Sequence, residues 1–116
     1  MSREHLFEGD LHWTGQATEV AGKLNLARSY DLDFAGKALL PGSSPAVFLG
    51  DERRHNPETL MVSSLMACHH LSYMALCERA GIRVVAYSDH GAGRLAFRDG
   101  KMRMVDLLLR PQVRIA

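Results

Sequence analysis

The sequence predicts one small domain, residues 1–116, that combines a long helix with β-strands. Three features predict it: an apolar segment over 57–80 bounded by helix signals, an alternating segment over 29–34, and two strand-like segments after residue 81. Alternation at every second position is typical of half-buried strands, whereas a long capped apolar run is typical of a buried helix. The 116 residues suffice for one core, which would bury roughly 65% of the unfolded chain's surface.

Three short strands are expected before the helix. Trp13–Thr18 and Lys23–Ala27 are predicted as two strands that turn around Val20–Gly22. The segment SYDLDFAGK, residues 29–37, is predicted as a third strand that ends near Gly36. Its large apolar residues, Tyr30, Leu32 and Phe34, alternate with Ser29, Asp31 and Asp33, as in a strand with one buried face.

The segment LPGSSPAVFLGDERRHNPE, residues 40–58, is expected to form a long ordered loop. It contains three of the four prolines and two glycines, which interrupt regular structure. Its central AVFLG is too apolar to remain in water, so we expect the loop to be packed rather than to act as a linker.

A helix is predicted between Asn56 and Gly81. Asn56 can cap the free amides, Pro57 suits the first helical position, and Glu58 complements the helix dipole. Gly81 is a natural stop. A helix that is apolar on most sides must be buried on most sides. Because so small a chain has little material to cover it, we expect a homodimer.

Two further strands are predicted after the helix, IRVVAYSDHGAGRLAF (82–97) and KMRMVDLLLRPQVRIA (101–116). The Asp99-Gly100 pair between them favours a tight type I′ hairpin. In that hairpin the side chains of Leu95 and Phe97 would lie opposite Met102 and Met104.

Composition argues against two classes of partner. Lys and Arg total 14 against 13 Asp and Glu, so no strong positive field is available to hold a nucleic acid or an anionic membrane. No uninterrupted apolar run reaches the roughly 18 residues of a membrane span, and the N-terminus lacks a signal-peptide pattern. We therefore expect a cytoplasmic protein whose two cysteines are thiols.

Cys68 has three interpretations. A lone cysteine on an apolar helix is most often a small packed residue. It is a reactive thiol if a nearby cation stabilises the thiolate, with Arg28, Arg53, Arg54 and the two following histidines as candidates. A metal site is the weakest interpretation, because Cys68-His69-His70 lacks the spacing that presents two ligands from one helix face.

Cys77 is not expected to form a disulfide with Cys68. Nine helical residues separate the two, which corresponds to about 180° of rotation and about 13.5 Å of rise. A disulfide requires α-carbons within about 7 Å. We expect Cys77 to pack or to be a semi-exposed thiol.

The pattern Asn56-Pro57-Glu58, followed by Cys68 and closed by Gly81, resembles the family of osmotically inducible protein C and organic hydroperoxide resistance proteins. The segment from Gly42 to Val84 is similar to the OsmC-like branch. The resemblance implies an α+β fold in which antiparallel sheets wrap the long central helices of an intertwined homodimer, with active sites at the subunit interface.

The resemblance also implies a function, the reduction of organic or fatty-acid hydroperoxides by a reactive cysteine. On this sequence the catalytic residues would be Cys68, Glu58 and Arg28. No bound cofactor or metal is implied; an external dithiol would restore the thiol. The family's resolving cysteine lies in a C-terminal helix beyond the point where this chain stops, so the chain is C-terminally short relative to the family. The alternative is a non-catalytic dimeric module that binds an apolar small molecule, with Cys68 as packing.

Overall fold

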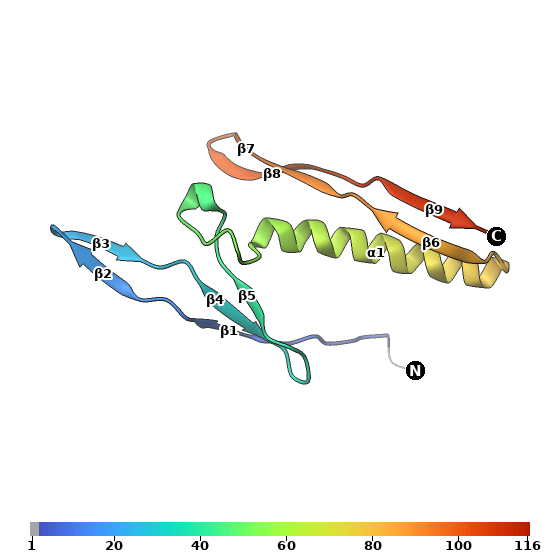
Figure 1. The fold of residues 1–116 in the computed structure, drawn as a ribbon, viewed down its shortest axis with the longest axis horizontal. Helices are drawn as coiled ribbons and strands as arrows, with labels where there is room; N and C mark the ends of the chain where they lie inside the picture. The colour runs from blue at the N-terminus through green and yellow to red at the C-terminus, as the bar shows by residue number, and fades with distance from the viewer. Residues whose placement is uncertain (1–2) are drawn as a thin grey trace. The chain divides into compact units, whose positions relative to one another are not determined.

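The computed structural model describes residues 3–116. Contacts within the chain fall into two units, one that ends at Pro57 and one that runs from Glu58 to Ala116. Within the described residues, β1 to β5 precede the α-helix and β6 to β9 follow it, and every pairing between these strands is antiparallel. The mixed α+β architecture with one long helix is therefore as the resemblance implies (Figure 1).

The first unit is built from five short strands. A three-stranded sheet has the order β1-β4-β5, and β2 and β3 form a separate hairpin. The bounds are β1 Asp10–Trp13, β2 Ala17–Val20, β3 Lys23–Leu26, β4 Tyr30–Asp33 and β5 Leu40–Gly42. The third predicted strand is confirmed as β4, although Phe34 follows its end and is exposed.

The predicted strand Trp13–Thr18 is wrong in its bounds, because the chain breaks into β1 and β2 around Gly15. A β-carbon at Gly15 would lie 2.4 Å from the β-carbon of Ala27, so the two backbones approach too closely for any side chain. The predicted turn is confirmed: Ala21 and Gly22 both have positive φ, 52° and 76°. Two such residues define the type I′ geometry that suits a two-residue hairpin.

The long loop before the helix is ordered by its own polar contacts. Ser43 is fully buried; its amide donates to the carbonyl of His55 at 2.7 Å, and its hydroxyl accepts from the amide of Asp51 at 3.0 Å. The loop also contains a 3-10 turn, η1 Ala46–Phe48. The strand β5 was not predicted because of Pro41, which is tolerated there since β5 lies at the edge of its sheet.

The predicted helix is confirmed as α1, Pro57–Ala80. It ends in a Schellman motif. The amide of Gly81 donates to the backbone carbonyl of Glu78 at 3.2 Å, and the amide of Ile82 donates to the backbone carbonyl of Cys77 at 2.9 Å. Gly81 has a φ of 71°, which a residue with a side chain adopts only with strain. Of the 24 described residues of α1, only Cys77 is buried.

The segment after α1 is a two-stranded ribbon with a break halfway. The bounds are β6 Val84–Asp89, β7 Ala92–Arg98, β8 Lys101–Leu108 and β9 Pro111–Ile115. Strand β6 pairs with β9, and β7 pairs with β8. The two predicted strands are thus each divided in two, and at the break a carboxylate oxygen of Asp89 accepts from the amide of Arg110 at 2.8 Å.

The predicted hairpin between β7 and β8 is confirmed in detail. Asp99 and Gly100 have φ values of 53° and 79°. Leu95 lies opposite Met104 and Phe97 opposite Met102. The register that the alternation predicted is therefore the observed one.

Two glycines let the ribbon approach α1. A β-carbon on Gly91 would lie 2.6 Å from the sulfur of Met66, and one on Gly93 would lie 2.7 Å from Cγ2 of Val62. The backbone at these two glycines therefore lies against side chains of α1. Figure 1 shows the ribbon running along α1.

Replacing Gly93 by valine should lower the free energy of unfolding by about 1–3 kcal/mol, because the new side chain would clash with those of Met104 and Val62. Urea unfolding followed by circular dichroism measures the change. Ala92→Val is the matched control, because Ala92 is an exposed neighbour on the same strand. Equal stability of the two variants would show that β7 does not pack on α1 as described.

Candidate functional site

Cys68 is an exposed, free thiol in the middle of α1. The helix residues that contact the ribbon, Val62 and Met66, lie about 120° and 160° around the helix from Cys68. Cys68 therefore lies on the helix face directed away from the ribbon. Cys77, about 180° from Cys68, is 7% exposed, so the two cysteines occupy opposite environments on one helix.

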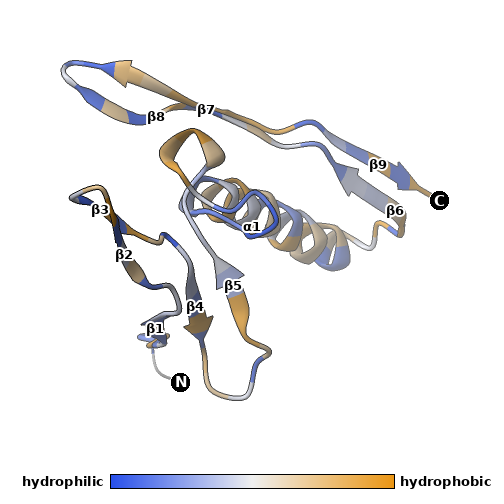
Figure 2. Cartoon of the chain, turned by 60° about the vertical axis from the view of Figure 1, so that its left-hand side comes forward, coloured by the Kyte–Doolittle hydropathy of each residue, from blue (hydrophilic) through white to orange (hydrophobic). Residues whose placement is uncertain are grey.

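The face that carries Cys68 is apolar and exposed. Its large neighbours lie within about 80° of Cys68 around the helix. They are Met61, Leu65, Leu71 and Leu76, exposed by 48%, 38%, 65% and 60%. Figure 2 shows hydrophobic residues recurring along the whole of α1. We call these four residues with Cys68 the thiol face. An apolar surface of this extent in a single chain is typical of an interaction site.

By length and composition alone, α1 also meets the criteria for a membrane-spanning helix. An 18-residue window within it has a mean hydropathy of 1.3, and 6% of that window is buried inside the chain. A single such helix is weak evidence, because the central helix of a soluble protein has the same composition. The expectation that no membrane is involved remains a prediction.

Glu58 begins α1 and lines a cavity between the helix and the ribbon. The cavity has a volume of about 330 Å³, and its other lining residues are Thr59, Val62, Ser63, Met66, Gly91, Gly93 and Met104. One carboxylate oxygen of Glu58, Oε1, is buried and has no hydrogen-bond partner among the described residues. Glu58 lies about 15 Å along the helix from Cys68, so the two do not meet within one chain.

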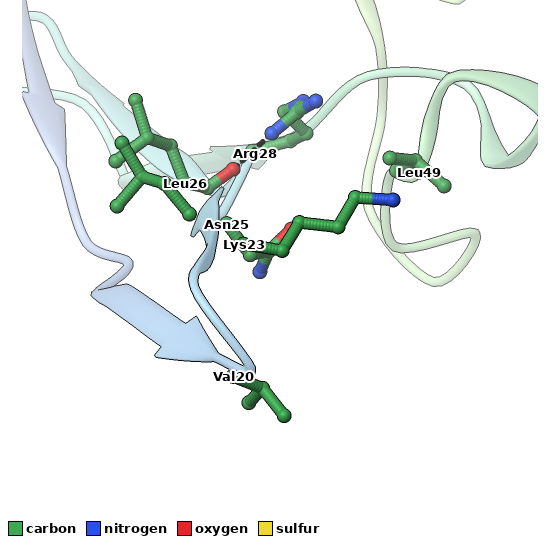
Figure 3. A pocket seen from close by; sticks show the side chains of 7 residues that line it. Val20, Lys23, Asn25, Leu26, Arg28 and Leu49 are labelled. Carbon is green, nitrogen blue, oxygen red and sulfur yellow. Dashed lines mark hydrogen bonds between the residues drawn. The ribbon is translucent and has the colours of Figure 1, made fainter.

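Arg28 lies between β3 and β4 in the first unit, where its guanidinium donates to the carbonyl of Leu26. It lines a cleft of about 650 Å³. Figure 3 shows the side chain of Lys23 extending toward Leu49 across this cleft, with Asn25 beside it. The remaining lining residues are Val20, Leu24 and Leu26. None of the described residues that line the cleft is acidic, so it offers two cations to an anion or a polarised oxygen.

The other two arginines that could have stabilised a thiolate are paired with carboxylates in the first unit. Arg53 donates through Nε to Asp51 at 3.1 Å, and Arg54 donates to Asp31 at 3.3 Å. The hydrogen bonds from Arg53 hold the pKa of the Asp51 carboxyl below its ordinary value. Arg28 is thus the candidate partner of the thiolate whose only described hydrogen bond is to a neutral carbonyl.

Sequence reasoning missed an aromatic cluster next to Cys68. The imidazole Nδ1 of His69 lies 3.0 Å from the hydroxyl of Tyr87 on β6. The ring of His70 meets Tyr87 edge-on, with centroids 4.4 Å apart, and Tyr73 lies 5.9 Å from Tyr87. Partial burial, followed by the charge of Asp89, raises the pKa of Tyr87 above its ordinary value, so its phenol stays neutral. No local signal marks Tyr87, because it is 18 residues from His69.

No group of three or more His, Cys, Asp or Glu residues within 3–116 could hold a metal ion. The two histidines after Cys68 contact tyrosines instead.

No protein-family model matches the chain, and no curated protein is significantly similar to it. Among solved structures, the chain is similar to an OsmC-like protein of unknown function, VCA0330 from Vibrio cholerae O1 biovar eltor strain N16961. The two share 25% sequence identity with a TM-score of 0.84, and the match covers 97% of this chain and 77% of that one.

The likeness of fold and the motif around Cys68 agree with one another. Residues 56–81 carry the resemblance in sequence, and residues 57–80 of that segment form α1. The chain therefore has an OsmC-like fold.

Proposed function

We propose that this protein is a thiol-dependent peroxidase that reduces organic hydroperoxides through Cys68 and acts in defence against oxidative stress. The observation that carries the proposal is the exposed thiol of Cys68 at the centre of an apolar helix face in an OsmC-like fold. The thiol is not covered by its own chain, and its apolar neighbours favour organic hydroperoxides over hydrogen peroxide. The OsmC-like family includes peroxiredoxin-like members.

The reaction needs a cation at the thiolate. Arg28 is the proposed partner, because its guanidinium stays charged and can hydrogen-bond both the sulfur and a peroxide oxygen. Glu58 is proposed to hold that guanidinium, since a carboxylate matches its fork and one oxygen of Glu58 still lacks a partner among the described residues. Attack by the thiolate on the distal oxygen expels an alcohol and leaves Cys68 as a sulfenic acid.

We propose further that the active form is a homodimer joined through the thiol face. Within one straight helix Glu58 and Cys68 are too far apart to act together. Two copies of α1 that pack antiparallel across a two-fold axis would bring Glu58 of one chain toward Cys68 of the other. The same packing would bury the four exposed apolar residues of the thiol face.

An external dithiol is the proposed reductant, because Cys77 is buried on the opposite side of α1 and cannot reach Cys68 without unfolding of the helix. Two free thiols suit a reducing compartment, and we propose a cytoplasmic location. The rival function is a dimeric module that holds an apolar small molecule, which the exposed apolar surface of α1 favours. The reactivity of Cys68 separates the two functions.

Cys68→Ser should abolish consumption of an organic hydroperoxide, because the attacking sulfur is lost. The measurement is peptide mass after one equivalent of cumene hydroperoxide with a sulfenic-acid trap present. The wild type should carry the trap on Cys68 and none on Cys77. Cys77→Ser is the control and should retain most of the activity. A folded, reduced wild type without an adduct on Cys68 would favour the binding module.

Arg28→Ala should slow alkylation of Cys68 by iodoacetamide at neutral pH by about tenfold or more, since a smaller fraction of the thiol is ionised without the guanidinium. The rate is measured as a function of pH. Arg53→Ala, which removes an exposed arginine bonded to Asp51, should leave the rate unchanged. An identical pH profile for Arg28→Ala and the wild type would remove Arg28 from the site.

Leu65→Lys should convert the proposed dimer to a monomer, because it places a charge in the apolar contact between the two helices. Sedimentation velocity at several concentrations measures the mass. Lys101→Glu, a charge change at the distant hairpin turn, should leave the dimer intact. A monomeric wild type, or a dimer unaffected by Leu65→Lys, would contradict the proposed interface.

A further inference from the structure

His69, the residue after Cys68, makes a side-chain contact that has no role in the reaction proposed above. His69 is exposed, and its Nδ1 lies 3.0 Å from the hydroxyl of Tyr87, which belongs to β6 and reaches α1 from the ribbon. Tyr73, one turn along the helix, lies at a ring separation of 6.4 Å from His69. One imidazole nitrogen thus contacts a residue from another element, which restrains the ring.

This hydrogen bond assigns different tasks to the two ring nitrogens. When His69 is an imidazolium, Nδ1–H donates to the phenol oxygen of Tyr87; in the neutral ring the direction of this bond depends on the tautomer. With Nδ1 engaged by Tyr87, Nε2 is the nitrogen that can donate to another group. The raised pKa of Tyr87 keeps the phenol neutral, so it does not compete for that proton.

Hydroperoxide reduction requires a proton at a particular place. In a reactive complex the distal oxygen lies about 3–3.5 Å from the sulfur, and the leaving oxygen lies one bond further away. Consecutive helical residues do not face each other, so His69 is not placed to bond the sulfur itself. A group that lies beside the cysteine, and not in contact with its sulfur, is suited to donate a proton to the leaving oxygen.

We propose that His69 donates a proton to the alkoxide that leaves during attack by Cys68, and that Tyr87 is the positioning residue that holds His69 for this step. The inference rests on the proposed peroxidase function. The thiolate forms a bond to the distal oxygen, which carries the peroxide hydrogen, and the O–O bond breaks. Sulfur is oxidised to the sulfenic acid, and the electron pair of the O–O bond departs on the alkoxide. The imidazolium gives its Nε2 proton to the alkoxide, forming the alcohol, and water protonates His69 again.

Several ionisable side chains lie near His69 and its partner Tyr87. On α1 these are Cys68, His70 and Tyr73, and on β6 they are Tyr87 and Asp89. His70 meets Tyr87 with its ring rather than through a hydrogen bond, so it does not share the acceptor.

The test uses two oxidants that differ in their leaving group. Tert-butyl hydroperoxide expels a strongly basic alkoxide that needs a proton, whereas peracetic acid expels a weakly basic carboxylate that does not. His69→Gln should slow single-turnover oxidation of Cys68 by tert-butyl hydroperoxide at least about tenfold, with a change of less than about threefold for peracetic acid. In the wild type the rate with tert-butyl hydroperoxide, divided by the rate with peracetic acid, should fall as pH rises, and this pH dependence should vanish in His69→Gln.

Tyr87→Phe keeps the ring and removes the hydroxyl, so it should show a smaller loss of the same selective kind. Tyr73→Phe is the matched control, because its ring stacks near His69 without a described hydrogen bond to it. Both tyrosine variants should unfold at the wild-type temperature to within a few degrees, and His69→Asn serves if His69→Gln does not fold.

Equal slowing of both oxidants by His69→Gln would overturn the inference, because it would indicate a structural role for His69. An unchanged rate with tert-butyl hydroperoxide would overturn it as well. A wild type whose Cys68 reacts with neither oxidant would instead refute the proposed function, which is a different result from a reactive Cys68 that does not need His69.

Discussion

The structure depends on one constraint, the burial of a 24-residue helix that is apolar on most sides. Gly91 and Gly93 lie close to the side chains of Met66 and Val62 on one face of α1, and Cys77 is the only buried residue among the described residues of the helix. The opposite face, with Leu65, Cys68 and Leu71, has no cover within residues 58–116. A helix of this composition is stable in water only when more of its surface is removed from the solvent.

The division of α1 into two faces also separates the roles of its residues. The face toward the ribbon carries the contacts of Val62 and Met66, so substitutions there act on stability. The thiol face combines the thiol proposed to be reactive, Cys68, with an apolar surface. His69 lies between the two faces, and its bond to Tyr87 links the ribbon to the residue beside the thiol. A change in β6 could therefore alter reactivity without touching Cys68.

The proposed reaction draws on parts of the chain that are distant in sequence, as is usual when a thiolate must be stabilised by a fixed cation. Arg28 belongs to a cleft that contains Lys23 and no acidic residue among those described, whereas Arg53 and Arg54 are engaged by carboxylates. Of the three arginines, Arg28 is the one outside the described ion pairs, and for this reason it is the proposed partner of the thiolate.

The sequence by itself determined the elements whose signals are local. Asn56 to Gly81 predicted α1 to the residue, Asp99-Gly100 predicted the hairpin and its register, and alternation predicted β4. The breaks at Gly15 and Gly91, strand β5 and the contact of Tyr87 with His69 were decided by tertiary structure. They depend on which backbones approach each other and on residues 8 or more positions apart, and neither periodicity nor propensity encodes such separations.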